Sequence, residues 1–262
     1  MTVLLPALFA MIVGQTAFPD PIFMSIFPIS SDARVRDGTV EIDARITGRS
    51  FSELTARRTA RYVAPGRFVA TVGPYPRSRD RVKKAYSECS FLVDCDEASV
   101  KSAFGLARHD LGDSMTMPDL TGWVSRYITN KTYSHDFDMA SVVAKRREGD
   151  CTEHAVLLAA LARSRKIPAR IVTGLALLEF SGKAAAVGHA WVEWHDGKRW
   201  LPADAALSKE EIAKYVGKMP FRLSYLPVRI LEREDAGFSA ALLNGPDIVD
   251  ISAVLVPAAK KQ

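Results

Sequence analysis

The chain has 262 residues, of which 48% are hydrophobic and 25% charged, and its formal net charge is +5. This composition is that of an ordinary globular protein, and it excludes a disordered chain, a collagen-like fibre or a repeat array. Arginines gather between Arg34 and Arg81, but no aromatic-interleaved pattern or nucleic-acid motif accompanies them. We therefore expect a solvated basic face there and no nucleic-acid partner.

The N-terminus resembles a secretory signal. Val3 to Val13 form an apolar run that only Pro6 interrupts, and small and polar residues follow it. This pattern indicates a candidate signal segment over residues 1–17, although the expected Lys or Arg before the run is missing. The run is shorter than the roughly 20 residues needed to cross a membrane, so we expect no stable membrane insertion. The prediction is a periplasmic or secreted protein; a buried N-terminal segment and a cytoplasmic protein are the alternative.

Residues 18–85 are expected to form an extended and β-rich N-terminal region. Prolines between Phe18 and Pro28 favour an extended segment. Thr39 to Ile46 alternates apolar and polar residues, and Arg67 to Val72 is strand-like after a turn at Ala64 to Gly66. A small sheet before the main domain follows from this pattern.

The three cysteines cannot all pair within the chain. Cys89 and Cys95 are close enough to form a small disulfide loop in an oxidising compartment, which would leave Cys151 free. A zinc site at the first two cysteines would need two further ligands, and only His109 lies near them in the sequence. The sequence also contains no calcium loop and no phosphate-binding glycine motif, so we expect no metal and no cofactor.

Residues 86–220 are expected to form the main domain, of the α+β class. Helical periodicity comes first, over residues 97–108, 117–130, 140–147 and 151–165. Strand patterns follow, over residues 169–180, 188–195 and 199–203, and then a short helix over 208–216. The helix at 151–165 is predicted to pack on the antiparallel sheet, and residues 221–262 remain as a C-terminal extension without an assigned function.

A nucleophile, a base and an orienting group follow from this arrangement. Cys151 would begin a helix, where unpaired backbone amides and the helix dipole stabilise a thiolate. Strand alternation would put His189, Trp191 and Glu193 on one face of the sheet. Asp204 lies just past a tight hairpin, so antiparallel pairing could bring its carboxylate beside the imidazole of His189.

Two blocks carry a specific family resemblance. Residues 149–174 read GDCTEHAVLLAALARSRKIPARIVTG, and residues 188–206 read GHAWVEWHDGKRWLPADAA. They resemble the core motifs of the transglutaminase-like superfamily, and the match to the family's pattern is dense over about residues 120–207. The resemblance implies a papain-like, transglutaminase-core fold with Cys151 as nucleophile, His189 as base and Asp204 as the residue that orients the histidine.

The resemblance implies cysteine-dependent acyl transfer on a peptide or protein substrate. An amide carbonyl would form a thioester with Cys151, and water or a primary amine would release the acyl group. Hydrolysis is slightly favoured over amine crosslinking. Two alternatives stay open, a non-catalytic binding or scaffolding module with the same fold, and a papain-like or cell-wall peptidase that shares the chemistry but not the motifs. The sequence leaves the oligomeric state open.

Aromatic residues around these motifs are weaker candidates for the site. Trp123 and Tyr133 fall in the stretch that resembles the family's lead-in helix and turn, and Trp191 lies two residues after the histidine. All three are candidate substrate-binding residues, although aromatic side chains at such spacing are more often core. Glu153 suits the first turn of the catalytic helix, and His154 is expected to serve packing or hydrogen bonding.

Overall fold

The structure is a computed structural model. It describes residues 26–29, 40–46, 60–64, 67–72, 75, 78, 80–132, 137–180, 183–218, 220–231 and 248–252. The candidate signal segment at residues 1–17 and the candidate substrate-binding residue Tyr133 lie outside the described residues.

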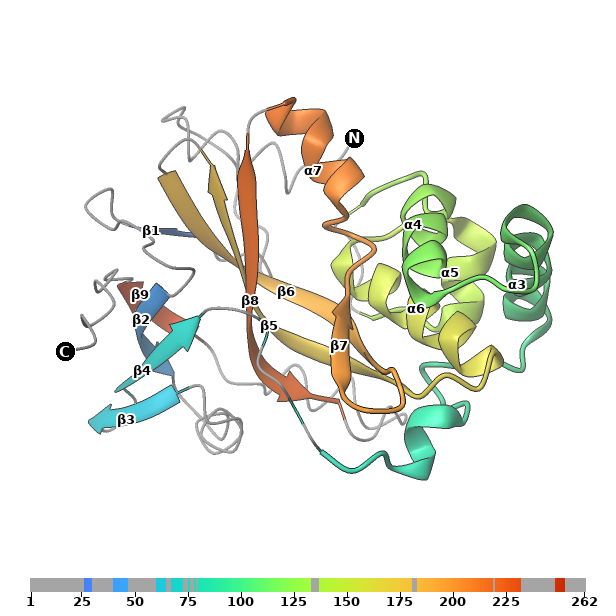
Figure 1. Ribbon diagram of the computed structural model, residues 1–262, viewed down its shortest axis with the longest axis horizontal. Helices are drawn as coiled ribbons and strands as arrows, with labels where there is room; N and C mark the ends of the chain where they lie inside the picture. Colours follow the sequence, from blue (N-terminus) through green and yellow to red (C-terminus); the bar gives the residue numbers. More distant parts are fainter. Residues whose placement is uncertain are drawn as a thin grey trace.

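A long sheet occupies the middle of the molecule, with a layer of helices at one end and a small second sheet at the other (Figure 1). The long sheet has the strand order β1-β6-β5-β8, and β7 also pairs with β6. Its strands are β1 (Ile26–Ile29), β5 (Ala169–Phe180), β6 (Lys183–His195), β7 (Trp200–Ala203) and β8 (Phe221–Ile230). The small sheet has the order β3-β4-β2-β9, with β2 (Val40–Ile46), β3 (Ala60–Ala64), β4 (Arg67–Val72) and β9 (Ile248–Ser252).

Four of the described helices lie in the chain between β4 and β5, and another lies between β7 and β8. A 3-10 turn, η1 (Lys84–Ser87), leads into them. The helices are α3 (Ala98–Leu111), α4 (Met117–Tyr127), α5 (Ala140–Arg146), α6 (Cys151–Ser164) and α7 (Lys209–Val216). Helices packed on an antiparallel sheet confirm the predicted α+β class.

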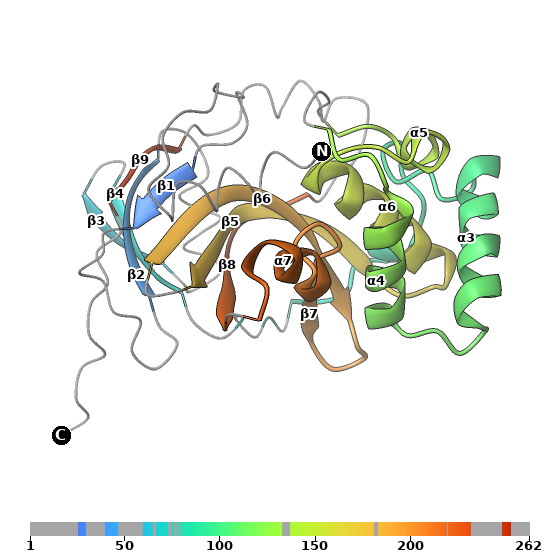
Figure 2. The ribbon, with the colours of Figure 1, turned by 90° about the horizontal axis from the view of Figure 1, so that it is seen from above.

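Helix α6 is the centre of the helical layer. Every residue from Glu153 to Arg163 is buried, because α3, α4 and α5 surround the helix and β5 and β6 lie against it (Figure 2). Its alanine, valine and leucine side chains form one core cluster with Ile171 and Val192 of the sheet. The run of small and branched apolar residues thus produces a helix buried on all sides, which fixes the position of its first residue.

β8 belongs to the same sheet as the predicted core strands. It pairs with β5 along its length, with Ala176 opposite Tyr225 and Gly174 opposite Pro227. The sequence analysis placed residues 221–262 in a C-terminal extension, but the first ten of them form this strand. Strand β9 from the same extension pairs with β2 in the small sheet.

Cys89 and Cys95 are joined by a disulfide, and Cys151 is free. The bond closes a loop between η1 and α3, and Cys95 is buried in the helical core. Within the described parts of the chain, we find no helix with the length and apolar character of a membrane span.

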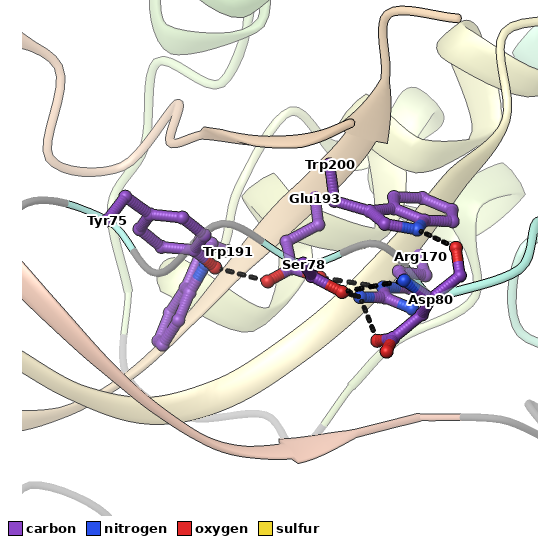
Figure 3. A network of polar contacts seen from close by, with 7 residues as sticks. All are labelled: Tyr75, Ser78, Asp80, Arg170, Trp191, Glu193 and Trp200. Atoms are coloured by element: carbon purple, nitrogen blue, oxygen red, sulfur yellow. Dashed lines mark hydrogen bonds and ion pairs between the residues drawn. The ribbon is translucent and has the colours of Figure 1, made fainter. Parts of the chain in front are cut away.

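A buried ion pair joins β5 to β6. Arg170 and Glu193 lie opposite each other in the ladder, are 1% and 0% exposed, and are 2.6 Å apart at their nearest charged atoms. The segment before η1 completes the network, because the Asp80 carboxylate accepts from Arg170 at 3.0 Å and the Tyr75 hydroxyl donates to Glu193 (Figure 3). The guanidinium also lies 4.0 Å from the centre of the Trp200 ring.

Removal of the Arg170 charge should destabilise the whole sheet. We expect Arg170→Met to lower the free energy of unfolding by about 3–5 kcal/mol, because Glu193 would remain buried without its cation. Arg199→Met is the matched control, since Arg199 is 47% exposed and lies 3.8 Å from Asp196, and it should cost less than about 1 kcal/mol. Urea unfolding of the variants measures both, and equal effects would contradict the prediction.

Candidate active site

The N-terminus of α6 is fixed by a complete capping box. The Asp150 carboxylate accepts from the Thr152 N–H at 2.8 Å, and the Glu153 carboxylate accepts from the Asp150 N–H at 2.8 Å. Gly149 precedes the cap with φ +142°, and a β-carbon there would lie 2.3 Å from the β-carbon of Glu153. The GDCTE segment therefore holds Cys151, the first residue of the helix, in one place.

The outer edge of β6 is unpaired where it meets Cys151. β1 pairs with β6 from Ala184 to Val187, and β7 pairs with the same edge from Val192 to His195. Between them, in the described chain, β6 has no ladder partner on that side. The backbone N–H of Ala190 lies in this gap and donates to the Cys151 thiol. The nucleophile therefore contacts the strand one residue away from His189.

His189 and Asp204 form a buried pair. Their Nε2 and Oδ2 atoms are 2.7 Å apart, and their side chains are 0% and 6% exposed. A turn after β7 positions Asp204, because its Oδ1 accepts from the N–H groups of Ala206 and Leu207, each at 2.9 Å. This arrangement brings together the predicted base and its orienting carboxylate.

The hydrogen bonds determine the tautomer of His189. Burial opposes the charge of Asp204, yet His189, the Leu207 N–H and Tyr225 together hold the pKa of its carboxyl below the usual range. An ionised carboxylate only accepts hydrogen bonds, so Nε2 of His189 carries the hydrogen. Nδ1 then has a lone pair and is buried without a hydrogen-bond partner in the described structure. It is the atom that can take a proton.

The sequence predicts an easily ionised thiol at Cys151, but its surroundings in the fold disfavour ionisation. Cys151 is half-buried, and burial raises the pKa of its thiol well above the usual value. The nearby carboxylates of Asp150, Glu153 and Asp204 raise the pKa further, and the Ala190 N–H acts in the opposite direction. The sequence located the helix end and shows Asp150 and Glu153 beside it, but the burial of the thiol and the approach of Asp204 become apparent only in the fold. A thiol in this environment needs a proton acceptor close by.

Aromatic rings surround the imidazole. Trp191 is 1% exposed, and its ring stacks near His189 with centroids 6.1 Å apart. The Tyr225 ring of β8 stacks on the imidazole with centroids 6.4 Å apart, and it lies tilted against the Trp191 ring at 5.0 Å. The Tyr225 hydroxyl donates to Asp204 Oδ2 at 2.8 Å. The Trp191 indole N–H donates to the hydroxyl of Tyr75 at 2.9 Å. The predicted candidate Trp191 thus lies beside the base, where it is buried.

Trp123 has a different position. Its side chain is buried, its indole N–H donates to Asp110 of α3 at 2.8 Å, and its ring stacks on Tyr127 at 4.4 Å. The structure therefore groups Trp123 with the packing between α3 and α4, and it does not bring Trp123 to the triad within the described chain. Tyr133 lies outside the described residues.

Sequence reasoning missed two residues of this site, Tyr225 and Tyr75. Tyr225 lies in the part of the chain that carried no motif, and Tyr75 lies in the region assigned to the N-terminal sheet. The alternation of apolar residues in Phe221–Ile230 is a strand signal. No local pattern says that this strand pairs with β5 and so approaches His189.

A surface pocket of about 460 Å³ lies between α4 and α7. Lys131 lines it, with its side chain 10% exposed and its ammonium 3.0 Å from Glu211. Burial lowers the pKa of Lys131, although Glu211 and Asp204 act in the opposite direction. Glu211 also binds Lys214 at 2.6 Å, so two lysines share one carboxylate. The pocket lies close to the turn that positions Asp204, but its lining contains neither Cys151 nor His189.

Comparisons with known proteins give one family match and several distant structural similarities. Residues 108–205 match the family described as the Transglutaminase-like superfamily, which confirms the resemblance seen in the sequence. Among solved structures, a candidate cysteine protease from Cytophaga hutchinsonii is 16% identical and has a TM-score of 0.44; the match covers 88% of this chain and 82% of that one. The periplasmic domain of TgpA from Pseudomonas aeruginosa is 14% identical, with 74% and 80% covered and a TM-score of 0.42. The search of curated proteins gave no match.

Glu153 and His154, two and three residues after Cys151 on α6, are both fully buried. His154 is 1% exposed, its Nδ1 bonds the Asp150 carbonyl, and burial lowers its pKa to about 4. Glu153 is 0% exposed, and burial together with Asp150 raises its pKa to about 8, against the N–H groups of Asp150 and Asp138. His154 is therefore neutral at pH 7, and Glu153 is mostly protonated.

The raised pKa of Glu153 predicts a pH-dependent stability. A carboxyl with pKa 4.5 when unfolded and about 8 when folded binds more protons in the native state. The free energy of unfolding therefore falls as pH rises between these two values. Glu153→Gln keeps a neutral side chain of the same shape, so we expect its stability to vary less with pH in that window. Urea unfolding at several pH values tests this, and identical slopes for variant and wild type would contradict it.

Proposed function

We propose that the protein is a cysteine-dependent acyl-transfer enzyme that acts on amide bonds of peptide or protein substrates. The observation that carries this proposal is the buried His189–Asp204 pair, at 2.7 Å, which leaves Nδ1 without a hydrogen-bond partner in the described structure. His189 directly precedes Ala190, the strand residue whose N–H contacts Cys151. Nucleophile, base and orienting carboxylate are the three groups that thioester chemistry requires.

Each step of the proposed reaction uses these groups. His189 Nδ1 takes the thiol proton as Cys151 Sγ bonds to the substrate carbonyl carbon. When the carbon–nitrogen bond breaks, the imidazolium gives this proton to the leaving amine, and a thioester remains. Water or a primary amine then attacks the thioester while Nδ1 takes its proton, and the thiol leaves with that proton. Asp204 stabilises the imidazolium throughout, and it holds the tautomer that leaves Nδ1 free.

The raised pKa of the thiol favours the one competing function. A cysteine that stays protonated suits a non-catalytic binding module with the same fold, unless His189 accepts its proton. The two functions differ in a measurable way, because only the enzyme needs Cys151 to react faster in the presence of His189 than without it.

Alkylation of Cys151 tests this difference without a known substrate. At about pH 6.5 an ordinary thiol is protonated, so we expect iodoacetamide to label wild-type Cys151 about 100-fold faster than in His189→Ala. His195→Ala is the matched control, because His195 is a half-buried histidine of the same strand that bonds only the turn at Gly197. It should label at the wild-type rate. Mass spectrometry of the labelled peptides gives the rates, and labelling that does not depend on His189 would favour the binding module.

Hydrolysis is the proposed outcome of the thioester, ahead of amine crosslinking. Glutamine-containing peptides incubated with and without an excess of a primary amine should give mainly the hydrolysed product, and Cys151→Ala should give none. Mass spectrometry distinguishes the two products, and a dominant amine adduct would reverse this assignment.

We further propose that the protein works in the periplasm or outside the cell. The Cys89–Cys95 disulfide supports this location, since such bonds persist in oxidising compartments. The candidate signal segment at residues 1–17 points the same way.

A further inference from the structure

One tyrosine hydroxyl contacts the same carboxylate oxygen as the catalytic histidine. Asp204 Oδ2 accepts from His189 Nε2 at 2.7 Å and from the Tyr225 hydroxyl at 2.8 Å. With the two backbone N–H groups on Oδ1, the carboxylate has four donors in all. The proposed mechanism requires only the first of these, so the hydroxyl on Oδ2 needs its own explanation.

Small residues on β5 let Tyr225 reach this carboxylate across the sheet. Tyr225 is opposite Ala176 on β5, and His189 is opposite Gly174. Alternation puts these four residues on one face of the sheet. A methyl group and a hydrogen at the two β5 positions leave space for the tyrosine ring over the strand, and the ring stacks 6.4 Å from the imidazole.

The position of the Tyr225 ring is fixed by its neighbours. It packs 5.0 Å from the Trp191 ring and 6.0 Å from the Tyr75 ring, the latter in an edge-on arrangement. Tyr75 is held by Trp191 and by Glu193, and Glu193 is bound to Arg170 (Figure 3). A ring in contact with the buried Trp191 and the half-buried Tyr75 has few other orientations, so its hydroxyl stays directed at Asp204.

We propose that Tyr225 is a positioning residue of the active site, which holds the Asp204 carboxylate in the orientation that supports His189 as a base. The inference rests on the proposed function. The hydroxyl acts through Asp204 and does not touch the reacting atoms. Burial and the nearby Asp204 charge raise the pKa of Tyr225 well above its usual value, so the hydroxyl remains a neutral donor.

Removal of the Tyr225 hydroxyl should change the pKa of Asp204 in a defined direction. Titratable groups that interact with Asp204 are His189 on β6, Tyr225 on β8, Cys151 and His154 on α6, and Lys131 after α4. Tyr225→Phe removes only one hydroxyl, which stabilises the ionised form of Asp204. Without it the pKa of Asp204 rises, and the carboxylate is lost as partner of the imidazolium at a higher pH than in the wild type.

Alkylation of Cys151 as a function of pH tests the proposal. For Tyr225→Phe we expect labelling about tenfold slower than wild type at about pH 6.5, the scale of one lost hydrogen bond to a charged group. The acid limb of the profile should move to higher pH. At high pH, where hydroxide in solution can take the thiol proton directly, the two rates should converge. Tyr127→Phe is the matched control, because its hydroxyl donates to the Ala144 carbonyl on α5 at 2.8 Å, and it should follow the wild-type profile.

Combination with His189→Ala separates positioning from a general structural effect. If Tyr225 acts through the histidine, Tyr225→Phe slows labelling in the wild type and has no further effect in His189→Ala. The proposal would be overturned if Tyr225→Phe slowed labelling equally at all pH values, or if its effect were additive with that of His189→Ala. It would also be overturned if Tyr225→Phe showed the pH profile of the wild type. A wild type whose labelling does not need His189 would instead overturn the proposed function itself.

Discussion

The site depends on the buried hydrogen bond between His189 and Asp204. Its two residues come from β6 and from the turn after β7, so the bond forms only when the β6–β7 hairpin is in register. It also determines which nitrogen of the imidazole is free, and His189 directly precedes Ala190, whose N–H contacts Cys151 in the gap of the β6 edge. The register of one hairpin thus positions both the base and the place where the nucleophile meets it.

The electrostatics of the site favour a protonated Cys151 thiol at rest. The helix end favours a thiolate, but burial and the charges of Asp150 and Asp204 have the larger effect. Asp204 therefore has two opposing effects, because its charge disfavours the thiolate and stabilises the imidazolium. In the proposed reaction, proton transfer from Cys151 to His189 would create a cation between the thiolate and the carboxylate, so the carboxylate that hinders the isolated thiol would support the pair.

The sequence predicted the triad and most elements because the signals were local. The capping residues around Cys151, the HAW strand and the hairpin before Asp204 each lie within a few residues of the group they position. Tyr225 and Tyr75 could not be predicted in the same way, since their contacts with the site join segments more than 20 residues apart. The raised pKa of Cys151 could not be predicted because its largest cause is burial, which depends on the packing of the whole fold.

The segment from Tyr75 to Asp80 is physically part of the site's framework. Sequence composition divides the chain near residue 85. Across this division, the Tyr75 hydroxyl donates to Glu193, and Asp80 forms an ion pair with Arg170. Glu193 and Arg170 are almost fully buried, and a buried charge that loses a hydrogen-bond partner is costly. A fragment that begins at residue 86 would expose this pair and also lose the Tyr75 ring that packs on Tyr225. The smallest unit that retains the active site therefore begins before Tyr75 and extends through β8.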